Sequence, residues 1–560
     1  MSKSISTSRF VSRSQRRFSL EWFLLIAIAI AVLLRIINLG SREFWYDEVL
    51  SLLLSSGQKS LYKNPNDVPV ALAQYLPALN LPVEQGLGDL LATAEKLLKG
   101  LVKEPHPPLF FIGQHLWLRL FGNSEAAMRS LVALYSVGAI GCAYGLGRCL
   151  LGYRGGLLFA ALLGLNPYYL FHSLNVRMYS SLVFWTILTA WTLLELISIN
   201  QKTPLPPTKP KAIAMFVLTV AIAAGLMTFY YFAVVLIALA VLVLWLDRRL
   251  WWQYALCFGT GVLINVPWVL WGTRQQLSNA DLERFAATGD WLATSRQHLQ
   301  DFVKTLGTHL ILGDWVNIAP FSLINIAGIS AIAILLLGSI SLWQQNQRQI
   351  LGIALMLGII PLLFMLGMDI VTKKFTLGFG DGRSVIFVLP GFLLLIAAWL
   401  ERGLRKGREI IALALLLMYL TISAADFGLR HRWMFHQIAD IIEQNPNTPT
   451  SIIMNSTAWG HVLRLVYYLP PTAPVTLLAQ QSDKLASAVE ATLDSNKRPE
   501  RILWLDSARP VWGEPSTEQE KKQIQQILDS QFQLKKTEKL LGTWELDNFN
   551  LSVYERNPNR

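Results

Sequence analysis

Long apolar blocks dominate the first three quarters of this chain of 560 residues. Between about residue 20 and residue 427, they alternate with short polar segments. A helix that crosses a membrane needs roughly 20 apolar residues, and about 17 is the minimum. The pattern therefore predicts an α-helical polytopic membrane protein with about 11 transmembrane helices. The predicted spans are 20–40, 126–147, 155–173, 179–198, 212–229, 231–246, 254–272, 318–343, 350–369, 384–400 and 410–427.

Two apolar stretches need an interpretation beyond their length. Residues 212–246 carry no charge and are too long for one span at 1.5 Å per residue, so we divide them at the aromatic pair Tyr230-Tyr231. Residues 107–121 are short, contain Arg119 and begin with two prolines. This stretch predicts a juxtamembrane helix that lies at the membrane surface rather than a span.

The basic residues predict the orientation of the chain. The net charge is +12, and Lys and Arg concentrate in alternate connecting segments, because cytoplasmic loops attract an excess of cations. These segments are 1–19, 148–154, 199–211, 247–253, 344–349 and 401–409. We therefore predict a protein of the plasma (inner) membrane with a cytoplasmic N-terminus. The opposite side then receives the outer loops 41–125, 273–317 and 370–383 and the C-terminal segment.

Residues 428–560 have the composition of a soluble domain. They contain 15 basic and 15 acidic residues, so the positive excess lies in the membrane part, and we exclude nucleic-acid binding. Short β-rich runs at 451–455, 474–478 and 501–505 alternate with helical patterns at 457–468, 483–495 and 517–532. This alternation predicts a small α/β domain with a partly parallel sheet. The predicted organisation is thus a cytoplasmic basic N-terminus (1–19), a transmembrane domain (20–427) and an extracytoplasmic α/β domain (428–560).

Two adjacent acids, Asp47 and Glu48, follow the aromatic pair Trp45-Tyr46 directly after the first span. A neighbouring acid and partial desolvation raise the pKa of a carboxyl group, and a base with such a tuned pKa can remove a proton from a hydroxyl group. The alternative is an interfacial helix start, because acids favour helix N-termini and aromatic residues favour the membrane interface.

Several cations and one histidine lie on the predicted outer side, where cations are scarce. Arg177 could grip a phosphate, or extend to the interface as long basic side chains do. Lys373, Lys374 and Arg383 lie close to Asp369 and Asp381, so they serve either an anionic ligand or local ion pairs. His106 could contact an anion or a metal ion, or be an ordinary loop histidine.

The order of these motifs resembles a known family. Trp45-Tyr46-Asp47-Glu48, the run 106–109, the segment 120–122, the stretch 147–155 and Arg177-Met178-Tyr179 are similar to the polyprenyl-phosphate-dependent glycosyltransferases of the GT-C superfamily. That branch includes protein O-mannosyltransferases and aminoarabinose transferases. The detailed resemblance covers roughly residues 30–185, and a looser one covers 383–400.

The resemblance implies roles for individual residues. It implies that Asp47 is the catalytic base with Glu48 beside it, and that Arg177 and Arg383 bind the carrier phosphate. Two positions depart from the family pattern. Asn175 stands where many relatives have an acid, and Ser384 stands where many have Tyr after the late Arg. The first departure puts a second carboxylate and any metal ion it would bind in doubt.

We therefore expect a membrane glycosyltransferase for hexosyl or pentosyl transfer. Its partners would be a polyprenyl-phosphate sugar donor, an acceptor hydroxyl on a lipid, glycan or protein, and the lipid bilayer. Transfer would invert the anomeric centre. Lys373 or Lys374 and His106 would assist at the phosphate. The sequence establishes no cofactor and leaves a divalent metal open. The alternatives are a transporter or flippase for lipid-linked sugars and a non-catalytic membrane scaffold.

Overall fold

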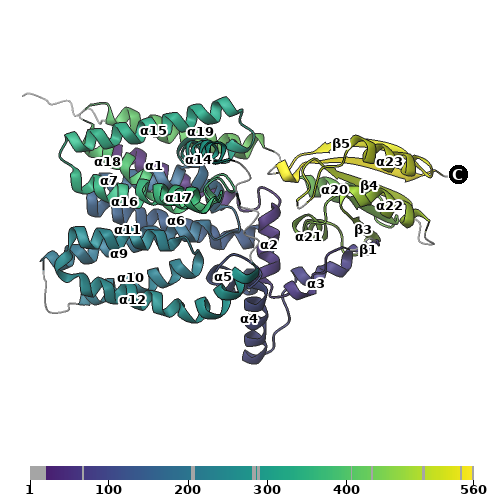
Figure 1. Cartoon of the computed structure of the whole chain (residues 1–560), viewed down its shortest axis with the longest axis horizontal. Helices are drawn as coiled ribbons and strands as arrows, with labels where there is room; N and C mark the ends of the chain where they lie inside the picture. The colour runs from purple at the N-terminus through teal and green to yellow at the C-terminus, as the bar shows by residue number, and fades with distance from the viewer. Residues whose placement is uncertain are drawn as a thin grey trace, which may run out of the picture.

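The computed structural model describes residues 20–557 except 66–67, 203–208, 280–285, 287–289, 405, 431–432, 495–498, 512 and 543–544. The predicted cytoplasmic basic segment 1–19 lies outside the described residues. Figure 1 shows a bundle of long helices and, beyond one end of it, a smaller domain that contains the sheet. The chain ends in that smaller domain.

Every predicted span coincides with a helix or with consecutive helices. The helices of the bundle are α1 (Leu20–Ile37), α6 (Glu125–Leu151), α7 (Tyr153–Leu165), α8 (Pro167–Ser173), α9 (Tyr179–Lys202), α10 (Lys209–Thr228), α11 (Phe232–Leu246), α12 (Trp251–Trp268), α15 (Phe321–Gln344), α16 (Arg348–Leu357), α17 (Ile359–Thr372), α18 (Leu389–Ala398) and α19 (Arg408–Leu429). In the described part of the chain, nine helices are long and apolar enough to cross a membrane. The predicted spans 155–173 and 231–246 contain the shorter apolar helices α7 and α11. The protein is thus a multi-pass membrane protein, and the number of 11 spans stays a prediction.

The predicted span 155–173 is divided in the structure. α7 ends at Leu165, and α8 begins at Pro167, whose missing N–H suits the first turn of a helix. The Asn166 side chain caps α8 by accepting a hydrogen bond from the backbone N–H of Tyr169 at 2.9 Å. This break directs the chain into the short turn that carries Arg177.

Small residues let α6 and α7 approach each other closely. A Cβ atom on Gly147 would lie 2.9 Å from the Cα atom of Gly156, so a larger side chain has no room. In a membrane, where lipid and side chains are equally apolar, such close packing is a main source of helix association. It fixes the α6–α7 hairpin, and with it the position of the following turn.

The segment between α1 and α6 contains short elements in place of a span. They are α2 (Tyr46–Ser55), the 3₁₀ turns Lys59–Leu61 and Leu72–Tyr75, the strand β1 (Val70–Ala71), α3 (Leu76–Leu79), α4 (Leu87–Leu101) and α5 (Leu109–Phe121). α5 has 13 residues and falls short of the minimum of about 17 for a span, as expected for the predicted surface helix. In Figure 1, α2 lies between the helix bundle and the smaller domain.

Between α12 and α15 the chain forms α13 (Arg274–Asn279), α14 (Trp291–Gly307), a π-helical turn (Thr308–Leu312) and a 3₁₀ turn (Gly313–Asn317). The segment after α17 leads to the 3₁₀ turn Arg383–Val388, which runs directly into α18. Both segments approach the α8 region, where Tyr168 packs against His309 with 4.6 Å between ring centroids.

The C-terminal domain is a six-stranded sheet flanked by helices. Its elements are α20 (Met434–Glu443), β2 (Thr450–Met454), α21 (Trp459–Tyr468), β3 (Val475–Ala479), α22 (Ser482–Leu493), β4 (Arg501–Ser507), α23 (Glu518–Asp529), β5 (Phe532–Leu540) and β6 (Phe549–Arg556). The strand order is β1-β3-β2-β4-β6-β5, with β2 parallel to both β3 and β4. The predicted strands correspond to β2, β3 and β4, so the predicted fold class is confirmed.

One strand of this sheet comes from the other part of the chain. β1 lies in the segment between α1 and α6 and pairs antiparallel with β3, with Val70 opposite Leu477 and Ala71 opposite Thr476. Backbone hydrogen bonds of a strand edge thus join the segment that carries Asp47 to the C-terminal domain.

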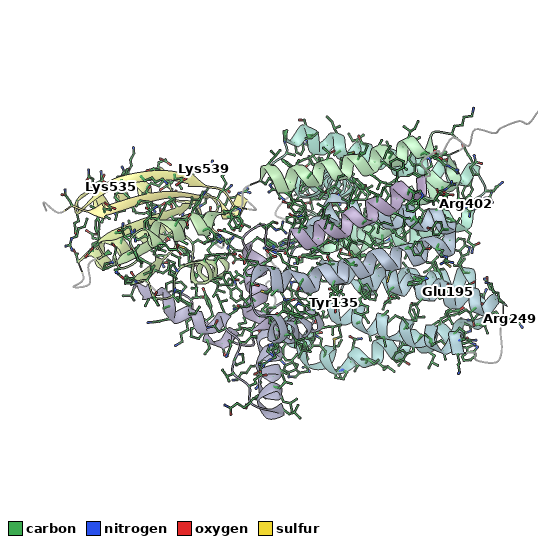
Figure 2. The ribbon with its side chains drawn as sticks, turned by 180° about the vertical axis from the view of Figure 1, so that it is seen from behind. Tyr135, Glu195, Arg249, Arg402, Lys535 and Lys539 are labelled. Atoms are coloured by element: carbon green, nitrogen blue, oxygen red, sulfur yellow. The ribbon has the colours of Figure 1, made fainter. Side chains whose placement is uncertain are left out.

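Residues of the basic connecting segments lie at the end of the bundle remote from the sheet. Figure 2 shows Glu195, Arg249 and Arg402 at the end of the bundle remote from the sheet, whereas Lys535 and Lys539 lie on the sheet. Arg249 and Arg402 belong to two of the basic connecting segments, so their location agrees with the charge asymmetry that predicted the orientation.

We expect the two ends of the molecule to be labelled from opposite sides of the membrane. In a variant without native cysteines, Lys535→Cys should react with a membrane-impermeant maleimide in intact cells. Arg249→Cys should react only after the cells are permeabilised, because the rule for cationic loops places it in the cytoplasm. Labelling of Arg249→Cys in intact cells would overturn the predicted orientation.

Candidate active site

Asp47 lies in the first turn of α2, the helix that separates the bundle from the C-terminal domain. Asp47 and Glu48 are the second and third residues of α2, where the unsatisfied N–H groups of a helix favour negative charge. Glu48 also reaches back to the start of the helix, because its Oε2 accepts a hydrogen bond from the Trp45 N–H at 3.1 Å. The sequence thus begins a helix at the point where the two acids occur.

Asp47 meets two arginines from distant parts of the chain. Its Oδ2 lies 3.0 Å from Arg383 Nη1 and 3.8 Å from Arg177 Nε. The three side chains are 8–15% exposed, so they are mostly buried but keep some contact with solvent. Asp47, Arg177 and Arg383 were separate candidates in the sequence. The structure brings them together in one cluster, here called the Asp47 cluster.

His106 joins the Asp47 cluster through Arg177. Its Nε2 lies 2.8 Å from Arg177 Nη2, and its ring stacks on Phe229 at 6.0 Å between centroids. Because the guanidinium group is always a donor, His106 Nε2 accepts this hydrogen bond and the ring is neutral in that arrangement. Gln276 donates to the backbone carbonyl of His106 at 2.9 Å and holds the loop in place.

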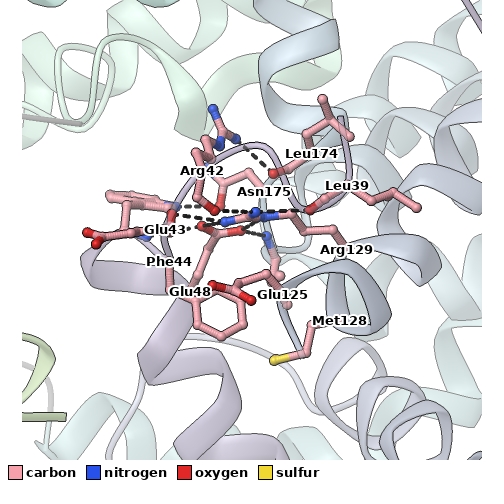
Figure 3. Close-up of polar contacts among 12 residues, drawn as sticks. Leu39, Arg42, Glu43, Phe44, Glu48, Glu125, Met128, Arg129, Leu174 and Asn175 are labelled. Atoms are coloured by element: carbon pink, nitrogen blue, oxygen red, sulfur yellow. Dashed lines mark hydrogen bonds and ion pairs between the residues drawn. The ribbon is translucent and has the colours of Figure 1, made fainter. Parts of the chain in front are cut away.

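Glu48 has a different environment from Asp47. It forms a fully buried ion pair with Arg129, with 2.8 Å from Arg129 Nε to Oε1 and 2.8 Å from Arg129 Nη2 to Oε2. Val176 N–H donates to Oε1 at 3.0 Å, so Glu48 receives four N–H donors in total. Figure 3 shows this network, with Arg129 at its centre.

Arg129 also binds the backbone of the chain that leads to Asp47. Its Nη1 donates to the carbonyls of Leu39 and Arg42 at 3.0 and 2.8 Å, and its Nη2 donates to the carbonyl of Glu43 at 3.0 Å. Sequence reasoning missed this residue, although a cation inside the predicted span 126–147 was a signal that it has a buried partner.

Charge compensation keeps Glu48 ionised. Burial by itself would raise the pKa of Glu48, but the charge and the hydrogen bonds of Arg129, together with Arg42 and the Val176 N–H, outweigh burial and lower its pKa below the usual range. A saturated and buried carboxylate cannot approach an acceptor hydroxyl. Glu48 therefore differs from Asp47 in its access to a substrate, and its expected part in the chemistry stays a prediction.

The turn that carries Arg177 is held by two side chains of the segment that leads to Asp47. Arg42 Nη2 donates to the carbonyl of Leu174 at 2.7 Å, and Trp45 Nε1 donates to Asn175 Oδ1 at 2.5 Å. Asn175 Oδ1 thus accepts an N–H bond at the first of the two positions that depart from the expected pattern. Its Nδ2 is buried without a hydrogen-bond partner among the described residues.

Arg383 is presented by a tight loop. Gly380, Asp381 and Gly382 have φ angles of 58°, 58° and 81°, the left-handed region that favours glycine. Tyr168 OH donates to the carbonyl of Asp381 at 3.1 Å, and His309 Nε2 lies 3.0 Å from the carbonyl of Gly382.

His309 and Ser384 hold the backbone of this loop through hydrogen bonds. Burial lowers the pKa of His309 to about 4, against the opposing effect of the hydrogen bond to Gly382, so the ring is neutral and donates from Nε2. Ser384, at the second position that departs from the family pattern, donates to the carbonyl of Thr376 at 2.6 Å and closes the loop.

The two predicted lysines occupy other positions. Asp47 has Arg177 and Arg383 as its ion-pair partners in the described part of the chain, and neither Lys373 nor Lys374 is among them. Lys373 is exposed at the C-terminal end of α17, and Lys374 follows it half-buried. Their expected contribution at the phosphate stays a prediction. Lys304 of α14, which the sequence did not single out, pairs with Asp381 at 2.6 Å.

The acidic and histidine residues do not form a metal site in the described ranges. No group of three or more His, Cys, Asp or Glu side chains that could hold a metal ion occurs among these residues. Asn175, two residues before Arg177, is an amide where the resemblance implies an acid in many relatives. The divalent metal left open by the sequence thus finds no such ligand set in the part of the chain that the structure describes.

The middle of the chain matches a known family. The family model of dolichyl-phosphate-mannose-protein mannosyltransferases matches residues 105–271. This range contains His106 and Arg177, and it lies between Asp47 and Arg383 in the sequence. The resemblance to GT-C glycosyltransferases that the motifs indicated is thus confirmed. No curated protein matches the chain in sequence.

Solved structures show distant similarities. The oligosaccharyltransferase of Archaeoglobus fulgidus, in a complex with zinc and sulfate, has a TM-score of 0.49 and 13% identity, covering 87% of this chain and 68% of that one. ArnT from Cupriavidus metallidurans bound to undecaprenyl phosphate has a TM-score of 0.45 and 14% identity, covering 96% and 98%. Both are similar to this chain at low sequence identity.

We expect that removal of Arg129 destabilises the whole segment around α2. Arg129→Met leaves the Glu48 carboxylate buried without its counter-charge, which typically costs about 3–5 kcal/mol. The melting temperature of the purified protein should fall clearly. A second substitution, Glu48→Gln, should restore much of the loss, because the buried charge is then removed.

The partly exposed pair Lys59–Glu104 provides the matched control. Its side chains are 15% and 16% exposed, and the distance is 2.7 Å, so Lys59→Met should lower the melting temperature less than Arg129→Met. Equal losses in the two variants would contradict a special role for burial of the Glu48–Arg129 pair.

Proposed function

We propose that this protein is a membrane glycosyltransferase that moves a hexosyl or pentosyl group from a polyprenyl-phosphate donor to an acceptor hydroxyl on the extracytoplasmic side. The observation that carries the proposal is the Asp47 cluster, in which one carboxylate meets two arginines at 3.0 and 3.8 Å. The match of residues 105–271 to a mannosyltransferase family supports the reaction class.

The net charge of the cluster suits the donor. Arg177 and Arg383 supply two positive charges and the Asp47 carboxylate one negative charge, which leaves one positive charge for a sugar phosphodiester with a single negative charge. Guanidinium groups bind phosphate oxygens through paired N–H donors, which also orients the phosphate. Arg383 also lies 5.2 Å from the Trp45 ring centroid, which keeps the guanidinium group in place.

The reaction then conserves the charge balance at each step. Asp47 takes the proton of the acceptor hydroxyl while the acceptor oxygen attacks the anomeric carbon. The bond from the anomeric carbon to the phosphate oxygen breaks, and its electron pair stays on the phosphate. The phosphate gains its second negative charge as Asp47 becomes neutral, so Arg177 and Arg383 stabilise the developing charge on the leaving group. Attack opposite to the leaving group inverts the anomeric centre.

His106 and Glu48 support these groups without touching the reacting atoms. His106 fixes the Arg177 guanidinium group at 2.8 Å, and Glu48 fixes the backbone of both Trp45 and Val176. Val176 directly precedes Arg177, and Trp45 lies two residues before Asp47. The Glu48 carboxylate therefore sets the position of Asp47, the proposed base, relative to Arg177, which binds the phosphate.

We expect that Asp47→Asn abolishes measurable transfer. Loss of a general base typically lowers the rate by about 10²–10⁴-fold, and Asn cannot accept the proton. The measurement is sugar transfer by purified protein from a short-chain polyprenyl-phosphate donor, with the melting temperature as a check of folding.

Glu104→Gln is the matched control, because Glu104 is a carboxylate of the same segment that pairs with Lys59 at 2.7 Å. Its transfer rate should stay within about twofold of the wild type, because Glu104 contacts Lys59 and none of the three residues of the Asp47 cluster. Undiminished transfer by Asp47→Asn would refute the role of Asp47. A wild-type protein that moves the intact lipid-linked sugar between leaflets without transfer would instead establish a flippase.

A further inference from the structure

The chain that leads to Asp47 lies between two parts of the molecule. On one side, Arg129 of α6 binds the carbonyls of Arg42 and Glu43. On the other side, α20 and α21 of the C-terminal domain contact residues 43–46. Figure 1 shows α2 in this intermediate position, with α20 and α21 on its far side from the bundle.

The first contact is a carboxylate at the start of α20. Glu43 Oε2 accepts a hydrogen bond from the Phe435 N–H at 3.0 Å, and Oε1 accepts one from the His436 N–H at 2.6 Å. His436 Nδ1 lies 2.7 Å from the same Oε1. Glu43 is 5% exposed, so its carboxylate is largely shielded from water, whereas the His436 side chain is 40% exposed.

The second contact is a single hydroxyl group that joins three elements. Tyr468 OH, at the end of α21, accepts a hydrogen bond from the Phe44 N–H at 2.6 Å and donates one to Glu125 Oε1 at 2.8 Å. Glu125 is the first residue of α6. The backbone of Phe44 is thus tied to the C-terminal domain and to the membrane bundle at the same point.

The third contact is close packing around Tyr46. A Cβ atom on Gly460 would lie 2.6 Å from the Tyr46 ring, so the ring occupies the space that a side chain would fill. The His461 ring packs edge-on against the Tyr46 ring, with 5.3 Å between centroids.

Arg464 of α21 makes a further contact with the same segment. Its Nη1 lies 3.4 Å from the Phe44 carbonyl, and its Nη2 pairs with Asp547 at 2.5 Å.

We propose that the C-terminal domain is a positioning domain for Asp47, in which Glu43 and Tyr468 tie residues 43–46 to α20 and α21 and so hold the carboxylate of Asp47 against Arg383. This inference rests on the proposed function for its catalytic consequence. Asp47 directly follows Tyr46, so the contacts at residues 43–46 restrain the position of its backbone. Tyr468 and Glu43 are positioning residues, because they act through the backbone and not on the substrate.

Neighbouring tyrosines provide a matched test. Tyr468→Phe removes the hydroxyl that binds Phe44, whereas Tyr467→Phe removes a hydroxyl that donates to the Asn123 carbonyl at 3.0 Å and not to the Phe44 backbone. For Tyr468→Phe, we expect kcat to fall by about tenfold to a hundredfold with the KM for the donor unchanged, since displacement of a reacting group by about 1 Å costs up to this much. Tyr467→Phe should keep kcat within about twofold of the wild type, because its hydroxyl does not bind the segment before Asp47.

Hydrogen–deuterium exchange of residues 43–48 tests the same contact without an assay of activity. Exchange should accelerate in Tyr468→Phe and in Glu43→Gln and stay at the wild-type rate in Tyr467→Phe, because loss of the tie lets this segment open more often. A Tyr468→Phe variant with unchanged kcat, or with unchanged exchange in residues 43–48, would overturn the proposal.

The two proposals can fail separately. If the wild-type protein transfers no sugar from any polyprenyl-phosphate donor, the proposed function fails. Exchange then decides whether the C-terminal domain holds the segment: faster exchange in Tyr468→Phe supports the tie, and an unchanged rate overturns it. If the wild type is active and Tyr468→Phe loses kcat without faster exchange, the loss has another origin and the positioning role is overturned.

Discussion

Glu48 and Arg129 form an ion pair with no exposed surface, and the geometry of the site depends on it. Each charge alone would be strongly unfavourable in this environment, so the two groups must meet, with every donor and acceptor directed at a partner. The surplus N–H groups of Arg129 bind the carbonyls of Leu39, Arg42 and Glu43, and the surplus lone pairs of Glu48 bind Trp45 and Val176. One compensated pair thus fixes the backbone segments that present Asp47 and Arg177.

The Asp47 cluster has the opposite character. Its charges are not balanced, because two arginines face one carboxylate, and its side chains keep some contact with solvent. The Asp47 cluster has unequal charges and some solvent access, whereas the Glu48–Arg129 pair is buried and fully hydrogen-bonded. The two groups of residues therefore suit different roles. The buried pair provides rigidity, and the accessible cluster can bind an anion and exchange a proton. In the proposed reaction, preorganised charges of this kind stabilise developing charge without a reorganisation cost.

The C-terminal domain extends this rigidity from the other side. It shares a strand with the segment before α6, receives Glu43 at the start of α20 and places the Tyr468 hydroxyl between Phe44 and Glu125. Contacts from both sides leave residues 43–46 little freedom. The same arrangement couples the two parts of the molecule, because neither can move relative to α2 without loss of hydrogen bonds.

The sequence by itself determined the membrane helices, the parallel strands β2, β3 and β4, and the candidates Asp47, Arg177, Arg383 and His106. Hydrophobic length and strand alternation are local properties, and a charge beside an apolar span is conspicuous. Only the tertiary structure decided that Glu48 pairs with Arg129, that Lys304 pairs with Asp381 in the loop of Arg383, and that Tyr468 binds Phe44. These partners are tens to hundreds of residues apart in the chain, and each side chain has many neighbours of suitable chemistry. Their pairing follows from how the helices pack, which no local pattern encodes.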